Sequence, residues 1–127
     1  MTPEVEAAIE ELRVQYPSQT IDVTPNAQGG AYVLMDDLPL GDQYTPARSW
    51  VGFVIGFQYP YADVYPHFLD AQVRRTNGQA IGVGFSGPTT WHNRQALQVS
   101  RRSNRWNPAT DSAAMKLAKV LDWVRTQ

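Results

Sequence analysis

A segment rich in proline and tyrosine near the middle of the chain restricts its fold more than any other feature. Residues 58–69 have the sequence QYPYADVYPHFL, with prolines at Pro60 and Pro66. Proline lacks an amide hydrogen and fixes φ, so this stretch cannot form a regular helix or a central strand. We therefore expect an extended, proline-stiffened segment that crosses from the elements before it to the elements after it.

The residues just before this segment alternate in the way that a buried strand does. Residues 49–57 have the sequence SWVGFVIGF. Gly52 and Gly56 fall on one side of this strand, where we expect another backbone to pack closely. The side chains predicted to share the opposite face are those of Val51, Phe53, Ile55 and Phe57.

A helix and a hairpin are predicted at the start of the chain. Thr2 can cap a helix, and apolar residues at helical spacing continue it to about Val14. Residues 21–23 and 31–35 are strand-like, and the turn-forming residues 26–30 lie between them. We therefore expect an antiparallel pair of strands after the first helix.

The second half of the chain predicts further strands and a final helix. LDAQVRR, residues 69–75, is a strand candidate, and AIGVGFSG, residues 80–87, is a weaker one before a polar loop leading to Trp91. Residues 108–127 are predicted to be helical, with Lys116 and Lys119 away from the apolar face. The element order predicts an α+β fold in which an antiparallel meander sheet is covered by helices on one side.

Composition limits the classes of protein that this chain can represent. A length of 127 residues predicts one domain, residues 1–127, and 43% hydrophobic content is ordinary for a globular protein. No apolar run is long enough to span a bilayer, and the first residues lack the features of a secretory signal, so we expect a cytoplasmic protein. The chain contains no cysteine, which excludes disulfides, thiolate metal sites and thiol catalysis.

The charges are unevenly distributed along the chain. Residues 1–70 carry ten acidic and two basic side chains, whereas residues 71–110 carry six arginines and no acidic residue. These arginines either present a positive surface to an acidic partner or pair with the acidic N-terminal part. A sequence pI near 6.0 makes nucleic acid an unlikely partner. The six are Arg74, Arg75, Arg94, Arg101, Arg102 and Arg105.

Two motifs, Tyr59-Pro60 with Pro66 following and Trp106-Asn107-Pro108 before a helix, together resemble those of the ubiquitin-conjugating enzyme (UBC-like) superfamily. Tyr59-Pro60, with Pro66 following, matches that family's Tyr-Pro segment, and Phe68 matches the core aromatic residue that opens its next strand. Trp106-Asn107-Pro108 before a helix is similar to the family's Trp-x-Pro turn. The motifs occur in the family's order over nearly the whole chain, in the manner of a divergent prokaryotic group.

The resemblance also locates the position of the family's nucleophile. In that family the catalytic cysteine lies about eight residues before the tryptophan of the turn, which is Gln98 in this sequence. A glutamine amide cannot form a thioester. The family's His-Pro-Asn element has only Trp91-His92-Asn93 as its counterpart, without the proline and at a shorter spacing, so its role is not transferred to Asn93.

The resemblance therefore implies a non-catalytic partner or scaffold in a bacterial ubiquitin-like conjugation system. The implied partners are a ubiquitin-like protein, an activating enzyme or an active conjugating subunit. An acidic surface or a C-terminal carboxylate is expected to dock on the segment from Arg94 to Arg105. The candidate partner-binding residues are Arg94, Gln98, Ser100, Arg101, Arg102, Arg105 and Trp123.

Two other functions remain open at this level. One is an interaction module of the related RWD type that has no link to ubiquitin-like proteins. The other is an enzyme that uses Ser100 or Ser103 as nucleophile and His92 as base, with Asp63 or Asp70 orienting the ring.

Neither a cofactor nor a metal site is expected. No phosphate-binding glycine motif is present, and two histidines with scattered aspartates do not form a recognisable ligand set. His67 is predicted to be a hydrogen-bonded structural residue. Trp123 is predicted either to be partly exposed at an interface or to fold back over a strand.

Overall fold

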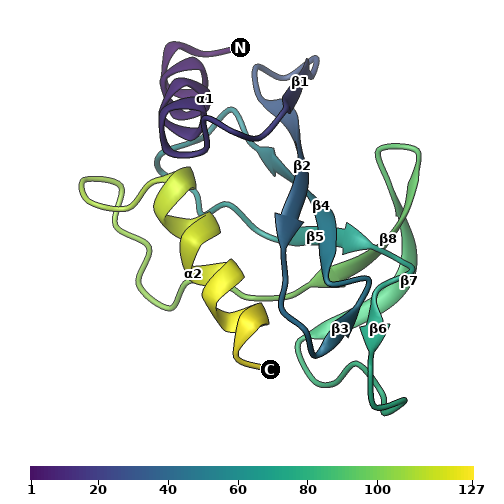
Figure 1. Cartoon of the computed structure of the whole chain (residues 1–127). Helices are drawn as coiled ribbons and strands as arrows, with labels where there is room; N and C mark the ends of the chain where they lie inside the picture. Colours follow the sequence, from purple (N-terminus) through teal and green to yellow (C-terminus); the bar gives the residue numbers. More distant parts are fainter.

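Two helices cover one face of a curved antiparallel sheet in the computed structural model, which describes residues 1–127 (Figure 1). Helix α1 spans Pro3–Gln15 and helix α2 spans Ala113–Arg125. The main sheet has the strand order β1-β2-β4-β5-β8-β7, and β3 pairs with β6 in a separate short ladder. The strands are β1 Ile21–Pro25, β2 Ala31–Pro39, β3 Tyr44–Thr45, β4 Arg48–Ile55, β5 His67–Asp70, β6 Arg74–Arg75, β7 Phe85–Trp91 and β8 Arg94–Val99. The α+β prediction, with an antiparallel sheet covered on one side, is confirmed.

The N-terminal predictions are confirmed at residue level. The hydroxyl of Thr2 accepts a hydrogen bond from the amide of Val5 at 3.1 Å, which caps α1. β1 and β2 pair antiparallel, with Val23 opposite Val33. The side chain of Asn26 accepts hydrogen bonds from the amide of Gly30 at 2.9 Å and from that of Gln28, so it shapes the turn between the strands.

The predicted alternation in β4 is correct inside the strand and wrong at its end. Val51, Phe53 and Ile55 are fully buried. Phe57 lies beyond the end of β4 and is 49% exposed, because the chain turns after Ile55. Gly52 does accommodate a close neighbour, but that neighbour is the indole ring of Trp91 rather than another backbone.

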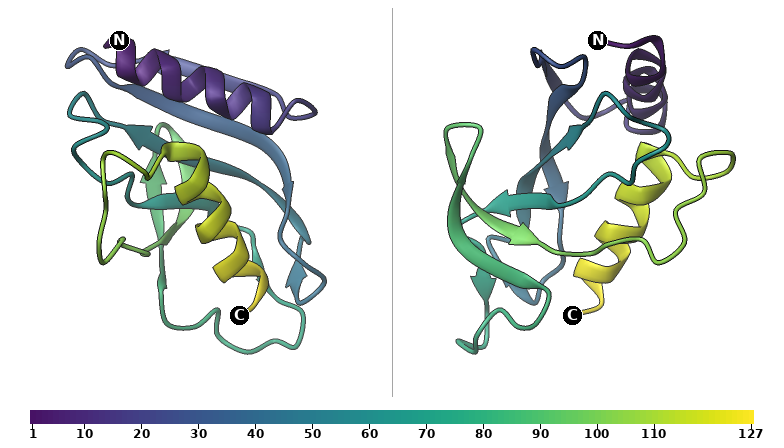
Figure 2. Two further views of the ribbon diagram at one scale, coloured as in Figure 1. Left: turned by 90° about the vertical axis from the view of Figure 1, so that its left-hand side faces the viewer. Right: turned by 180° about the vertical axis from the view of Figure 1, so that it is seen from behind.

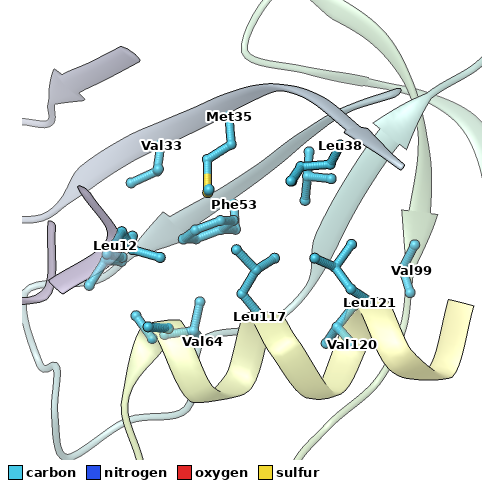
Figure 3. Close-up of a cluster of buried hydrophobic side chains, with 14 of the residues drawn as sticks. Leu12, Val33, Met35, Leu38, Phe53, Val64, Val99, Leu117, Val120 and Leu121 are labelled. Atoms are coloured by element: carbon cyan, nitrogen blue, oxygen red, sulfur yellow. The ribbon is translucent and has the colours of Figure 1, made fainter. Parts of the chain in front are cut away.

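A single buried cluster joins both helices to the sheet. Leu117 and Leu121 point from α2 toward Phe53 at the centre of the sheet (Figure 3). Leu12 adds the apolar side of α1 to the same cluster. Burying a side chain of this size contributes about 1.5–3 kcal/mol, so the 26 buried residues of the cluster fix the position of α2 against the sheet.

Helix α2 begins later than its sequence predicted. Its first residue is Ala113 rather than Pro108, because Ser112 caps it by accepting a hydrogen bond from the amide of Met115 at 3.1 Å. Residues 107–111 form a separate turn, in which the amide of Asp111 donates to the carbonyl of Asn107 at 2.7 Å. The prediction that Lys116 faces away from the core is also wrong, since its side chain is only 3% exposed.

The crossing segment is irregular as predicted, but it is shorter. Residues 56–66 contain no strand, and β5 begins at His67. The predicted strand over residues 69–75 is wrong, because Leu69 and Asp70 end β5 and a turn then leads to the two-residue strand β6. Residues 80–84 are not a strand either, and Gly82 and Gly84 there have positive φ.

A hairpin replaces the predicted polar loop around Trp91. β7 and β8 pair antiparallel from Phe85 opposite Val99 to Trp91 opposite Arg94. His92 and Asn93 form the two-residue turn, with φ of 46° and 66°. The hairpin curves away from the helices (Figure 2), and Trp91 lies across the open face of the sheet on Gly52.

Candidate binding site

The Tyr-Pro and Trp-x-Pro motifs meet in space. The indole Nε1 of Trp106 donates to the carbonyl of Pro60 at 2.6 Å. The rings of Tyr59 and Trp106 lie 6.3 Å apart, and the Tyr59 hydroxyl accepts a hydrogen bond from the amide of Ala113 at 3.1 Å. The crossing segment, the turn before α2 and the first residue of α2 are thus held together by one contact set.

An ion pair between the buried Lys116 and the partly buried Asp63 makes a second link beside the first. Lys116 on α2 donates to both carboxylate oxygens of Asp63, at 2.8 and 2.9 Å, and to the hydroxyl of Ser103 at 2.7 Å. The amide of Ser103 also donates to Asp63 at 2.8 Å. Burial favours the neutral acid, but hydrogen bonds from Lys116 and Ser103 outweigh it and leave the pKa of Asp63 below 3.8.

These two links fix the residues between β8 and the Trp-x-Pro turn, residues 100–106, which we call the arginine loop. Its middle is attached through Ser103 to Asp63 and Lys116, and its end is attached through Trp106 to Pro60. Figure 2 shows this part of the chain, in yellow-green, running beside α2. A loop held at two points presents its remaining side chains in a defined arrangement.

A pocket of about 310 Å³ lies between the arginine loop and α2. Five cationic side chains and one carboxylate line it, and its apolar wall comes from Val120 and Trp123. The pocket is therefore electropositive, although the whole chain has a net charge of −1. The lining residues are Arg101, Arg102, Ser103, Asn104, Arg105, Asp111, Lys116, Lys119, Val120 and Trp123.

Two of the three arginines of the loop stack on aromatic rings. The guanidinium of Arg101 lies 4.7 Å from the centre of the Trp123 ring, and that of Arg102 lies 4.5 Å from the Tyr65 ring. The ion pairs of the molecule are Arg48–Asp37, Lys116–Asp63 and Lys119–Asp111. None of the six arginines between residues 71 and 110 takes part, so they do not pair with the acidic N-terminal part.

Trp123 both folds back over a strand and remains partly exposed, which are the two alternatives that the sequence left open. Its ring packs 5.1 Å from the ring of Phe85, and a Cβ on Gly84 would lie 2.5 Å from it. It is nevertheless only partly buried and forms one wall of the pocket. The tryptophan thus folds back over β7 and still offers a surface to a ligand.

Gln98 and Ser100 do not line the pocket. Gln98 pairs across the sheet with Phe68 and Ser86, on the face opposite α2. Its side-chain amide donates to the hydroxyl of Ser100 at 3.1 Å. Hydrogen bonds from Ser100 and then Arg102 lower the pKa of Tyr65. Gln98, to which the sequence resemblance assigns the family's nucleophile position, is therefore part of a strand and carries no nucleophilic group.

Arg94 is separated from the other arginine candidates. It lies at the far end of β8, opposite Trp91, and its guanidinium stacks 5.4 Å from the centre of the Trp50 ring. Trp50, Trp91 and Phe68 form a small aromatic cluster on the open face of the sheet. The structure thus brings Arg101, Arg102 and Arg105 together with Trp123 but leaves Arg94 outside the pocket.

The geometry contradicts a serine–histidine mechanism. His92 lies in the turn before β8 and stacks 4.3 Å from the Tyr32 ring, whereas Ser100 follows the other end of β8. At about 3.3 Å per residue, the length of β8 separates them by about 20 Å. Ser103 is bound to the Lys116 ammonium and the Asp63 carboxylate, so it has no free base beside it.

His67 is buried beneath this site without the hydrogen bonds that its sequence context predicted. Neither ring nitrogen has a partner, and the ring packs 5.0 Å from that of Phe53. Burial, together with the nearby Lys116 charge, lowers the pKa of His67 to about 3. The histidine is neutral at physiological pH, and no sequence pattern indicated that it would be unpaired.

The structure contains no group of three or more His, Asp or Glu side chains arranged to hold a metal ion. Its helices are also too short and too polar for any of them to cross a bilayer.

The fold and the motif contacts define the class of the protein. An N-terminal helix, an antiparallel meander, a Tyr-Pro segment bonded to a Trp-x-Pro turn, and a helix packed on the sheet together make a UBC-like domain. The chain belongs to prokaryotic E2 family E, whose family model matches residues 8–127. No curated protein and no solved structure matches the chain. Its sequence contains no cysteine.

Proposed function

We propose that this protein is a non-catalytic member of its E2 family that binds a component of a bacterial ubiquitin-like conjugation system. Membership of an E2 family implies partners from ubiquitin-like conjugation in general. The observation that carries the proposal is the combination of an intact frame around Trp106 with the absence of a thiol anywhere in the chain. The partner is a ubiquitin-like protein, an activating enzyme or an active conjugating subunit.

The loss of thioester chemistry follows from the residues present. A thioester requires a thiolate, and Gln98 carries an amide that neither ionises nor attacks a carbonyl. Ser100 has no histidine within reach, and Ser103 is held between a lysine and an aspartate. A hydroxyl without an activating base is a weak nucleophile.

The contacts that hold the arginine loop beside α2 support a binding role. The contacts of Trp106 and Lys116 hold the arginine loop beside α2 although no reaction centre lies between them. Arg101, Arg102 and Trp123 are left partly or fully exposed around a preformed pocket. Tryptophan and arginine are the residues most enriched at the energetic centres of protein interfaces.

Calorimetry of the full chain with purified candidate partners tests the proposal. The candidates are the ubiquitin-like, activating and conjugating proteins encoded near its gene. We expect at least one complex with a Kd in the micromolar range or tighter. Absence of binding to every protein of that set would remove the proposal and favour an interaction module of the RWD type.

A pair of variants then tests the position of the interface. The double variant Arg101→Glu, Arg102→Glu reverses two charges in the pocket and is expected to abolish binding. Arg94→Glu changes the same kind of residue, also stacked on a tryptophan, outside the pocket. Normal binding by the double variant would remove this interface without removing the function.

A further inference from the structure

The positive charge of the pocket is largely free of internal counter-ions. Lys116 is neutralised by Asp63, and Lys119 lies 3.9 Å from Asp111. Arg101, Arg102 and Arg105 have no carboxylate partner. Three of the arginines that line one pocket therefore have no carboxylate to occupy their hydrogen-bond donors.

Two of these guanidinium groups are already oriented. Stacking on Trp123 and Tyr65 uses the flat faces of Arg101 and Arg102, and apart from the Arg102 hydrogen bond to Tyr65 it leaves the N–H groups at their edges available. The loop that carries them is fixed by the hydrogen bonds of Ser103 and Trp106. A ligand that binds there meets arginines that have already lost much of their conformational freedom.

We propose that this pocket binds an acidic peptide segment, in which two or three Asp or Glu side chains of an extended chain meet the three arginines. This inference rests on the proposed function and names the chemistry by which the partner is recognised. A carboxylate accepts two parallel hydrogen bonds from one guanidinium, which matches the donors available here. Val120 and Trp123 supply an apolar wall for the methylene groups of the ligand.

A peptide fits the pocket better than a nucleic acid does. The cationic side chains are confined to one pocket of about 310 Å³, which has room for a few side chains rather than for a long backbone. Residues 1–70 carry ten acidic side chains, including Glu4, Glu6 and Glu10 exposed on α1. A polyanionic strand extending beyond the pocket would meet this negative surface.

Fluorescence anisotropy with labelled synthetic peptides tests the inference on the full chain. The probe contains three Glu residues in a Gly-Ser context and has an amidated C-terminus, so that only side chains supply carboxylates. Its control replaces each Glu with Gln. A third arm uses the Gln peptide with a free C-terminus, and a fourth uses a single-stranded oligonucleotide carrying three phosphates.

We expect the Glu peptide to bind and the Gln peptides and the oligonucleotide to bind at least tenfold more weakly. Arg101→Gln and Arg102→Gln should each weaken binding of the Glu peptide by about tenfold, or about 1.4 kcal/mol, because each removes a charge-assisted hydrogen bond. Arg94→Gln is the matched control and should bind like the unmodified chain. Raising the salt concentration should weaken binding.

Several results would overturn the inference. They are equal binding of the Glu and amidated Gln peptides, tighter binding of the oligonucleotide or of the free C-terminus, or no effect of Arg101→Gln and Arg102→Gln. Self-association of the chain that is lost in Arg101→Gln, together with no binding of the Glu peptide, would instead assign the pocket to α1 of a second copy. If the Glu peptide binds but no protein of a conjugation system does, the peptide site is retained and the proposed function is removed. If a conjugation protein binds but the Glu peptide does not, the proposed function is retained and this inference is removed.

Discussion

At each end of strand β8 an arginine stacks on a tryptophan, but the surroundings of the two pairs differ. At one end Arg94 stacks on Trp50, and beyond the other end Arg101 stacks on Trp123. Each end also has a tryptophan ring packed on a glycine, Trp91 on Gly52 and Trp123 on Gly84. Both ends of β8 therefore combine an arginine stacked on a tryptophan with a tryptophan packed on a glycine.

The two ends differ in how many cations lie nearby and in how the chain that carries the arginine is held. Arg94 lies on the open face of the sheet beside aromatic rings, without a second cation in its cluster. Arg101 lies on a loop tied to α2 and to the crossing segment, and it shares a pocket with two further arginines and two lysines. Stacking orients a single arginine, whereas an anion site also needs a fixed loop that gathers several of them.

The largest expected effect comes from removing the attachment that only the pocket end has. Lys116→Ala removes the cation beside Asp63, whose side chain is 19% exposed and keeps its hydrogen bonds from Ser103, so we expect a loss of about 3 kcal/mol, the lower end of the range for a buried ion pair. Denaturant unfolding measures this change in the free energy of unfolding. Lys119→Ala is the control, because that side chain is 69% exposed, and it should change stability by less than about 0.5 kcal/mol.

If Lys116→Ala proves as mild as Lys119→Ala, then the arginine loop is not held by this ion pair. The two ends of β8 would then differ only in the number of cations near each arginine. Peptide binding by the Lys116 variant should fall together with its stability if the account is correct.

A methyl group added at the Arg94 end is expected to have the next largest effect. In Gly52→Ala the new Cβ would lie 2.2–2.8 Å from the ring of Trp91, which is only 6% exposed and has little room to move. Overpacking of this kind costs about 1–3 kcal/mol, so Tm should fall while peptide binding in the pocket is unchanged. Differential scanning calorimetry and the anisotropy assay measure the two quantities.

Gly84→Ala provides the matched substitution at the pocket end. Its Cβ would lie 2.5 Å from the Trp123 ring, at a residue whose φ of +94° disfavours alanine. This variant should lose stability and peptide binding together, because Trp123 must move. Loss of binding in Gly52→Ala, with binding retained in Gly84→Ala, would reverse the assignment of the site.

Acid is expected to destabilise the protein through His67, which lies beneath the pocket end near Lys116 and Asp63. The folded-state pKa of about 3 lies below the ordinary value of 6.5, so the unfolded state binds the proton first as the pH falls. Stability is fully present above about pH 6.5 and declines toward pH 3, by about 2 kcal/mol between pH 7 and pH 5.

Urea unfolding at a series of pH values measures this dependence. His67→Leu should remove most of the loss above pH 4, whereas the contribution of Asp63 is lost only as the pH falls below about 3.8, because its folded pKa is lowered. His92→Leu is the control, since that residue lies in the β7–β8 turn. An unchanged pH profile in His67→Leu would contradict this account of the buried histidine.

The smallest effects on stability are expected from the arginines themselves. An exposed cation–π contact contributes about 0.5–1 kcal/mol, so Arg94→Gln and Arg101→Gln should each destabilise the protein by no more than this. Their effects on peptide binding should differ by about tenfold. Equal binding losses would show that the two ends of β8 are equivalent.

Local patterns predicted much of this fold. The Thr2 cap, the alternation through Phe53 and the turn at Asn26 depend on neighbours in sequence, and each was predicted correctly. The β7–β8 hairpin was missed, because Gly87-Pro88 interrupts its first strand and the His-Asn turn lacks the usual glycine.

The site depended on contacts between distant residues and was predicted only in part. The cationic segment and the motif around Trp106 were visible in the sequence. The burial of Lys116 was not, since its partner Asp63 lies 53 residues away. The grouping of Arg101 with Trp123, and the separation of Arg94 from both, likewise depend on how β8 and α2 pack.

Intact-mass spectrometry of a reconstituted reaction tests the central claim most directly. The chain is incubated with the activating enzyme and the ubiquitin-like protein encoded near its gene, together with ATP, and its mass is measured with and without hydroxylamine treatment. We predict an unchanged mass for the chain, with a complex that size-exclusion chromatography detects and that the double variant Arg101→Glu, Arg102→Glu abolishes. A covalent adduct that adds the mass of the ubiquitin-like protein to the chain would contradict the account.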